Sequence, residues 1–274
     1  MKKILLIATM AVLTLTVQAQ EWTAPITMNG NAITSDNVAD INNLSGITDG
    51  SVSYDYPTNT LTIENVAWVR GSSNTQYFAK SLEYTMPLTI IVKGTCELDN
   101  GGQQRAFIFA AKNAAVVIKG EDVESSTLKF ITGNNVNADE NGEMTFQDLT
   151  VECVNSIWAI GGWSSSTPAK KLTIDNCNIT AHPSAGMFVD VLDIEFIDCE
   201  FVKPEGAAFD AEKKAVVYGE GLKLKDVDVE VRATKGTGVE NITAAKNAQK
   251  VVENGVIYLI RDGKRYNVLG AEVK

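Results

Sequence analysis

Residues that often carry catalysis are scarce in this sequence. The 274 residues include four cysteines and one histidine, His182, which is followed by Pro183. A zinc site built on histidines, or a serine–histidine pair, would therefore depend on that one residue. So few cysteines also exclude a disulfide-packed scaffold. We expect no bound cofactor.

Basic residues are outnumbered by acidic ones. There are 24 lysines and arginines against 34 aspartates and glutamates, and the formal net charge is -10. A nucleic acid or an anionic lipid surface would be repelled at long range, so we expect no nucleic acid among the partners. The content of 45% hydrophobic and 21% charged residues is typical of an ordered globular protein.

Long apolar runs are absent except near the N-terminus. Lys2 and Lys3 precede an apolar stretch over residues 4–17, and Val17-Gln18-Ala19 resembles a peptidase site. This pattern predicts a signal peptide over residues 1–19, cleaved after Ala19, and hence a secreted protein. A helix needs roughly 20 apolar residues to span a bilayer, so we expect no transmembrane segment after cleavage. A retained N-terminal anchor is the alternative.

An apolar-x-apolar unit repeats through the middle of the chain. The third residues of successive copies are Ile63, Ile90, Ile118, Phe146, Ile174, Phe196 and Leu224. Their spacings are 27, 28, 28, 28, 22 and 28 residues. A near-constant period over so many copies indicates a repeat architecture.

Each copy contains three short strand-like stretches separated by bends. The first stretch alternates apolar and polar residues, which is typical of a half-buried strand. An Asn or Asp, which tolerates a tight bend, follows in several copies, at Asn65, Asp148, Asn176, Asp198 and Asp226. The pattern predicts an all-β fold, a right-handed parallel β-helix (solenoid) of about seven coils. An antiparallel sandwich is the alternative, but few Asn-Gly hairpin signals separate the strands.

The alternation assigns an inside and an outside to the first strand of each coil. The residues two before each origin are all apolar and are expected to line the interior: Leu61, Leu88, Val116, Met144, Leu172, Ile194 and Leu222. The intervening residues are Thr, Glu or Lys, except for Val117, and are expected to face water.

The ends of the chain differ from the repeat. We expect an N-terminal cap over residues 20–60, the β-helix over 61–231 and a polar linker over 232–255. Alternating residues flank Asp262-Gly263, a strong hairpin signal, so residues 256–274 are expected to form a small C-terminal hairpin or tail.

Two segments resemble known families. Gly50-Ser51-Val52-Ser53-Tyr54-Asp55, followed by Thr58-Asn59-Thr60-Leu61-Thr62-Ile63, resembles secreted bacterial β-solenoids of the carbohydrate-binding domain-containing, pectate-lyase-like type. The resemblance covers roughly residues 29–150 and implies glycan binding. The ending from Gly255 to Lys274 resembles short type IX secretion sorting signals. This second resemblance implies a place at the outer surface or in the periplasm of a Gram-negative bacterium, and a structural cap is the alternative.

Two groups of carboxylates are candidates for chemistry. Asp175 and Glu195 are expected to lie ~8 Å apart on the outer face, close enough for an acid and base pair, although Lys223 is expected to neutralise Glu195. The bend residues Asp148, Asp198 and Asp226 would stack, and a Ca²⁺ ion could offset their repulsion. An ordinary solvated face and an ordinary turn ladder are the favoured readings. The clustered Asp, His and Arg of pectate lyases and polygalacturonases are not matched.

Two further pairs of residues are singled out. Trp158 and Trp163 lie beside Gly161 and Gly162 and could stack on a sugar, or one of them could belong to the core. Cys177 and Cys199 occupy equivalent places in adjacent coils, where a disulfide and a pair of buried thiols are equally expected.

These observations favour a protein that binds without catalysis. We expect a secreted or surface-attached β-solenoid whose partner is a polysaccharide or cell-surface glycan. A polysaccharide lyase or glycoside hydrolase acting through Asp175 and Glu195 is the first alternative. A structural adhesin with a protein partner is the second.

Overall fold

The computed structural model describes residues 21–70, 77–83, 85–101, 106–235, 249–253, 256–261, 264–266 and 272–273. This part of the chain is almost entirely β, with one short helix, α1 (Ile41–Ser45), and one 3-10 turn, η1 (Val38–Asp40). None of its helices is long and apolar enough to span a membrane. The expected signal peptide, residues 1–19, lies outside the described residues.

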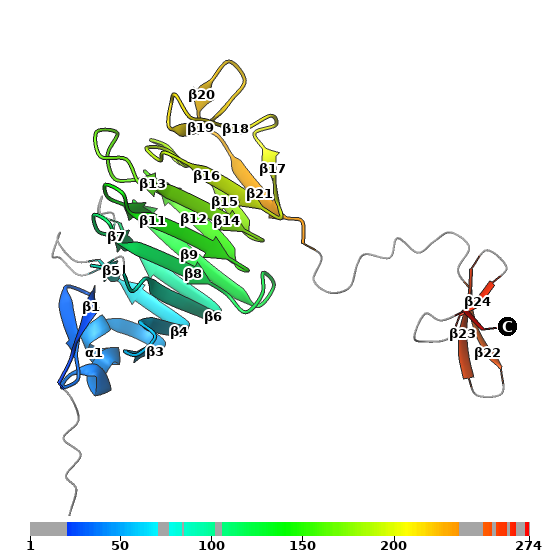
Figure 1. The fold of residues 1–274 in the computed structure, drawn as a ribbon, viewed down its shortest axis with the longest axis horizontal. Helices are drawn as coiled ribbons and strands as arrows, with labels where there is room; N and C mark the ends of the chain where they lie inside the picture. The colour runs from blue at the N-terminus through cyan, green and yellow to red at the C-terminus, as the bar shows by residue number, and fades with distance from the viewer. Residues whose placement is uncertain are drawn as a thin grey trace, which may run out of the picture.

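A parallel β-solenoid of about four turns forms the body of the fold, as expected from the repeat. Figure 1 shows its strands stacked as successive rungs. The first face contains β4 (Thr60–Val69), β6 (Leu88–Asp99), β8 (Ala115–Lys119), β11 (Glu143–Gln147), β14 (Lys171–Asp175) and β16 (Ile194–Ile197). The second face contains the latter halves of β4 and β6 with β9 (Ser126–Gly133), β12 (Thr150–Ser156) and β15 (Asn178–Ala181). The third contains β5 (Ala79–Ser81), β7 (Ile108–Ala110), β10 (Val136–Ala138) and β13 (Ile160–Gly162).

The register of the first face follows the repeat over five copies. Leu88 pairs with Val116, Val116 with Met144, Met144 with Leu172, and Leu172 with Ile194. All five are buried, whereas the intervening column is partly or fully exposed. In the first copy the register is displaced by two residues, because Leu61 pairs with Ile90 rather than with Leu88. A shift of two keeps the side-chain face unchanged, so Leu61 is still buried.

The seventh copy does not form a coil, and the placement of Leu222 in the interior column was wrong. After β16 the strands become antiparallel: β21 (Val229–Ala233) lies between β15 and β17 (Cys199–Lys203) and opposes both. A separate antiparallel sheet contains β18 (Ala208–Asp210), β19 (Ala215–Tyr218) and β20 (Leu222–Lys223). Gly219 and Gly221 have positive φ angles of 53° and 82°, which suit the reversing turn between β19 and β20. Leu222 consequently stands 58% exposed.

The N-terminal residues cover the first turn of the solenoid. β1 (Thr23–Met28) pairs antiparallel with both β2 (Asn31–Thr34) and β5, and β3 (Ile47–Asp55) pairs antiparallel with β4. The edges of the first strands are therefore hydrogen-bonded instead of free, which suppresses edge-to-edge association.

The C-terminal strands form a sheet of their own. It contains β22 (Gln249–Glu253), β23 (Val256–Arg261), β24 (Lys264–Tyr266) and β25 (Glu272–Val273), all antiparallel. β23 and β24 flank Asp262-Gly263, where the sequence indicates a hairpin. β22 lies within residues 232–255, which the sequence pattern assigns to a linker.

Matched substitutions at Leu172 and Thr173 test the register. Leu172→Asn removes a fully buried apolar side chain and buries an amide, so it should lower the free energy of unfolding by ~3 kcal/mol or more. Thr173→Asn, on the outer side, should change it by less than ~1 kcal/mol. Chemical denaturation of both variants measures the difference, and a larger loss for Thr173→Asn would show that the two faces are exchanged.

Candidate functional site

The two tryptophans singled out from the sequence come together at one hollow of the third face. Its volume is about 300 Å³, and we call it the Trp cavity; its lining residues are Asn134, Asn137, Trp158, Gly162, Trp163 and Asp190. Trp158 and Trp163 are 40% and 37% exposed. Neither is a core residue, so both indoles offer surface to a ligand.

The third strands of two coils position this cavity. Asn137 in β10 pairs with Gly161 in β13, and the residues on either side of Asn137, Val136 and Ala138, are buried in the interior. Asn137 therefore occupies the outward position of its strand. The backbone N–H of Trp163 donates to the carbonyl oxygen of Ala138 at 2.7 Å, which holds the start of the Ser-rich loop against β10.

Two glycines allow the next coil to approach the cavity closely. A Cβ atom on Gly162 would lie 1.9 Å from the carbonyl oxygen of Asp190, and one on Gly161 would lie 2.6 Å from that of Val189. Because real Cβ atoms do not approach so closely, a side chain at either position would force residues 189–190 away. The glycines therefore bring Asp190 to the edge of the Trp cavity.

Aromatic contacts hold Trp163 in place. Its ring meets the edge of Phe109 with centroids 5.6 Å apart, and Phe109 stacks on Tyr77 at 4.8 Å. Lys80 Nζ lies 5.6 Å from the centroids of both Tyr77 and Phe109. Phe109 itself is 5% exposed, so it supports the indole from beneath. Such a supported ring loses little freedom when a ligand binds.

The Asn137 side-chain oxygen and the Asp190 carboxylate are the acceptors of the Trp cavity that bear on ligand binding. Asn137 Nδ2 donates to the carbonyl oxygens of Gly161 and Gly162 at 3.3 and 3.4 Å, while its Oδ1 is buried and has no partner among the described residues. The Asp190 carboxylate makes no hydrogen bond or ion pair to the described part of the chain. Partial burial raises the pKa of Asp190, and the positive charges of Lys223 and Lys214 oppose that rise.

Sequence reasoning missed Asn134, Asn137 and Asp190. A usable signal was the pair of glycines beside the two tryptophans, because adjacent glycines in a strand indicate that another backbone passes close by. The glycines alone do not tell which residues pass close by, because that depends on how many residues the next coil contains.

Asp175 and Glu195 are each held by a different neighbour. Glu195 Oε2 accepts a hydrogen bond from Lys171 Nζ at 2.6 Å, so Lys171 neutralises it in place of the expected Lys223. Asp175 Oδ2 accepts one from Gln147 Nε2 at 3.3 Å. Burial, and next the charge of Asp148, raise the pKa of Asp175. The two carboxylates share no hydrogen-bond partner.

The bend column contains two of the three expected aspartates. Asp148 and Asp198 have left-handed φ angles of 52° and 49°, as does Asn176 between them at 48°. Asn176 Nδ2 donates to Asp148 Oδ1 at 2.6 Å, so this amide stabilises the carboxylate that a bound cation would otherwise stabilise. The placement of Asp226 in this column was wrong: it lies in the antiparallel part, where its N–H donates to the carbonyl oxygen of Pro183 at 2.8 Å. The described residues contain no group of three or more His, Cys, Asp or Glu side chains that could hold a metal ion.

Cys177 and Cys199 lie next to each other in adjacent coils. The N–H of Cys177 donates to Cys199 Sγ at 3.3 Å, and all four cysteines are free thiols. Burial raises the pKa of both thiols. The structure thus shows the pair as thiols, and formation of a disulfide between them under oxidising conditions stays a prediction.

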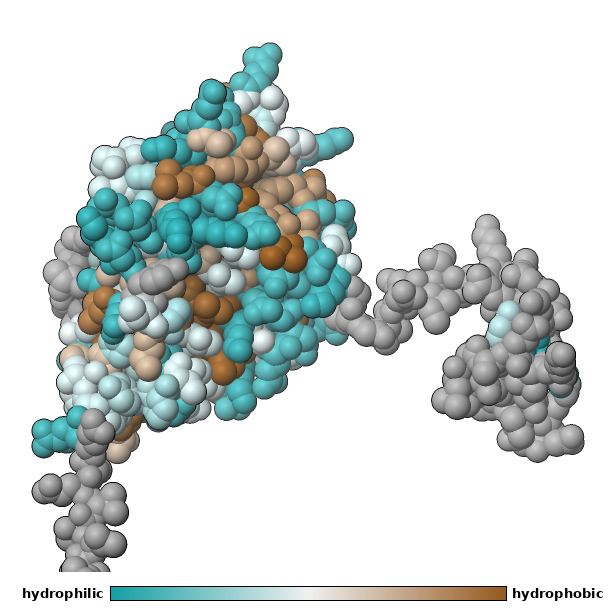
Figure 2. Space-filling view, in the orientation of Figure 1, coloured by the Kyte–Doolittle hydropathy of each residue, from teal (hydrophilic) through white to brown (hydrophobic). Residues whose placement is uncertain are grey.

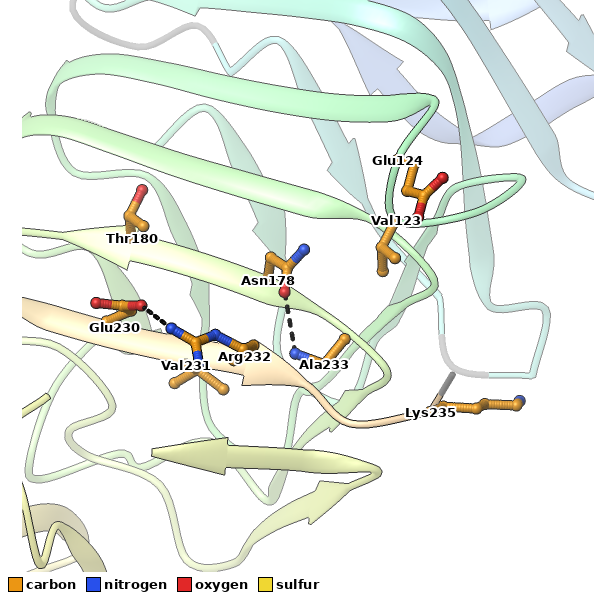
Figure 3. Close-up of a pocket in the computed structure, with 9 residues that line it drawn as sticks. All are labelled: Val123, Glu124, Asn178, Thr180, Glu230, Val231, Arg232, Ala233 and Lys235. Carbon is orange, nitrogen blue, oxygen red and sulfur yellow. Dashed lines mark hydrogen bonds and ion pairs between the residues drawn. The ribbon is translucent and has the colours of Figure 1, made fainter. Parts of the chain in front are cut away.

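A larger hollow, of about 480 Å³, lies over β15 and β21 (Figure 3). Two of its four charged lining residues pair with each other, since Arg232 Nη2 contacts Glu230 Oε1 at 2.8 Å. Lys203, which does not line the hollow, also contacts Glu230, with Nζ 3.3 Å from Oε2. These two cations hold the pKa of Glu230 below its usual range. The Trp cavity is smaller, but it alone of the two brings exposed indoles together with amides and a carboxylate, so it is the stronger candidate.

Comparison with protein-family models, with curated proteins and with solved structures finds no match to this chain. The case for a function therefore depends on the geometry of the Trp cavity and on the resemblance in the sequence.

The raised pKa of Asp190 predicts a stability effect. A carboxyl whose pKa is higher in the folded than in the unfolded state destabilises the fold when ionised, and this cost disappears as the pH falls through the folded pKa. Asp190→Asn cannot ionise and suits the left-handed φ of 58°, so it should be more stable than the parent protein at pH 7. The advantage should vanish below about pH 3, under the ordinary Asp value.

Thermal unfolding at both pH values measures this effect. The exposed Asp193→Asn is the matched control and should leave the midpoint nearly unchanged. A midpoint for Asp190→Asn below that of the parent at pH 7 would contradict the argument.

Proposed function

We propose that this chain is a non-catalytic glycan-binding protein and that the Trp cavity holds a sugar ring. The observation that carries this proposal is the convergence of two exposed indoles with two amides and a carboxylate around one hollow of about 300 Å³. Sugar rings have apolar C–H faces that stack on aromatic rings and hydroxyls that need polar partners. A few placed polar groups in an aromatic cavity meet both needs.

The distribution of apolar side chains on one face of the molecule agrees with this choice. On the face that Figure 2 shows, apolar side chains form separate patches between hydrophilic ones instead of one continuous apolar surface. Large exposed apolar patches mark protein or membrane contacts. A small aromatic cavity is better suited to a small hydroxylated group.

The carboxylates support binding without turnover. Glycoside hydrolysis commonly uses two carboxyl groups on opposite sides of one bond. Asp190 is the single carboxylate among the described residues that line the Trp cavity, and Glu195 is engaged by Lys171. A lyase or hydrolase acting through Asp175 and Glu195, and an adhesin with a protein partner, are the alternatives that the experiment below must separate.

The proposal also includes the handedness of the solenoid and the cellular location of the protein. A right-handed solenoid is supported by the general handedness of parallel crossover connections. Export through the segment 1–19 is supported by its basic start and apolar run. Display at the surface or in the periplasm of a Gram-negative bacterium is supported by the resemblance of the C-terminal tail to sorting signals.

Substitution of the indoles tests glycan binding. Trp158→Ala and Trp163→Ala should each lower the affinity for a retained glycan by about tenfold or more, since aromatic anchors contribute about 2 kcal/mol at such sites. Val69→Ala removes an exposed apolar side chain from β4, three rungs away from β13, and should leave the affinity unchanged.

The measurement is retention on a panel of polysaccharides, with reducing ends assayed in parallel. Binding without release of reducing ends agrees with the proposal. Release that Glu195→Gln abolishes would establish the enzyme instead, and the lack of retention on any glycan would leave the protein-binding adhesin.

A further inference from the structure

The Trp cavity combines one negative charge with an amide oxygen that is unpartnered among the described residues, beside the N–H donors of its two indoles. Asp190 is the one charged residue among the described residues that line it. No described lysine or arginine lines the cavity, although Lys214 and Lys223 act on Asp190 from outside it. A ligand that carries a carboxylate would therefore be repelled by Asp190.

Asn137 supplies an acceptor that lacks a donor in the described part of the chain. The residue is 3% exposed, and its Oδ1 is buried without a hydrogen bond from the described residues. Its Nδ2 faces the carbonyl oxygens of Gly161 and Gly162, which only accept. Turning the amide over would set Oδ1 against those oxygens, so the acceptor orientation is fixed. A buried acceptor without a partner is costly, and a ligand that donates to it removes that cost.

The indoles and the carboxylate together fit a cation. An ammonium group has three donors and no acceptor, which matches Asn137 Oδ1 and the Asp190 carboxylate. The faces of Trp158 and Trp163 attract a cation through their quadrupoles, and indole is the best of the aromatic rings for this contact. β13, which leads into Trp163, pairs with β10 and so brings the indole to the strand that carries Asn137.

We infer that the Trp cavity selects a sugar with a free amino group over neutral, N-acetylated and acidic sugars, with Asp190 and Asn137 as acceptors for its ammonium. This inference rests on the proposed glycan binding and names the substrate class of the same cavity. A volume of about 300 Å³ lies at the small end of ligand pockets and suits one substituted ring.

Small glycosides test the inference on the full chain. The probes are methyl glucosaminide, methyl N-acetylglucosaminide, methyl glucoside and methyl glucuronide, with tryptophan fluorescence and saturation-transfer NMR as readouts. Single sugars avoid the general attraction of a polycationic glycan to a chain of net charge -10. Methyl glucosaminide should bind about tenfold tighter than the neutral glycosides, the factor expected for one charge-assisted contact.

Two matched variants locate the selectivity. Asp190→Asn should reduce the affinity for methyl glucosaminide to that of the neutral glycosides and leave the latter unchanged. Asp193→Asn, three residues along and exposed, should preserve the preference. The comparison of probes on the parent protein needs no variant, so the inference is tested even if Asp190→Asn fails to fold.

Every other outcome contradicts one named part of this inference. Equal binding of amino and neutral glycosides overturns the inference and leaves glycan binding intact. Failure of every sugar, polymers included, to bind overturns both. Equal loss in Asp193→Asn means long-range attraction only and overturns the role of Asp190. Binding of Nα-acetyl-lysine amide as tight as that of methyl glucosaminide overturns the assignment to a sugar.

Discussion

The parallel backbone pairing of residues about one coil apart is the constraint on which the structure depends. Thr145 pairs with Val117 on one side and Thr173 on the other, so each position of a coil lies beside its equivalent in the next. Period-two alternation then produces continuous inner and outer columns. The interior column consists of apolar side chains that stack directly, and the outer side is left free to vary. The Trp cavity is a product of that freedom, because it occupies outward positions of the third face.

The central coils could be predicted from the sequence because two patterns agree there. A spacing of 28 residues and an alternation of apolar and polar residues both place Met144 on Leu172, and the structure pairs them. The patterns disagree at the ends. The spacing from Leu61 to Leu88 is 27 residues, and the register there shifts by two. The spacing from Leu172 to Ile194 is 22 residues, and parallel strand pairing ends at β16, the strand that contains Ile194. Leu222 and Asp226 matched the pattern by composition, but the antiparallel return through β19 and β20 removed them from the stack.

Only the two tryptophans of the Trp cavity could be predicted from the sequence. Residue type alone marked Trp158 and Trp163, since an exposed indole beside glycine is unusual. Asn137 gave no such mark, because the third strands are short and buried at every position, so they carry no alternation from which an outward residue could be recognised. Asp190 reaches the cavity through the close approach at Gly162, a contact between residues of different coils. Glu195 on the regular first face, by contrast, is neutralised by Lys171, a neighbour on the adjacent strand.

Cross-linking across the outer column tests the parallel register most directly. In the Thr145→Cys, Thr173→Cys double variant the two Cα atoms would be neighbours at ~4.8 Å, within disulfide range. In Thr145→Cys, Asp175→Cys they would be ~8 Å apart, beyond that range. Peptide mapping of oxidised, unreduced protein should therefore find the 145–173 cross-link and not the 145–175 one. A 145–175 cross-link formed as readily as the first would contradict the register, and with it the construction of the Trp cavity.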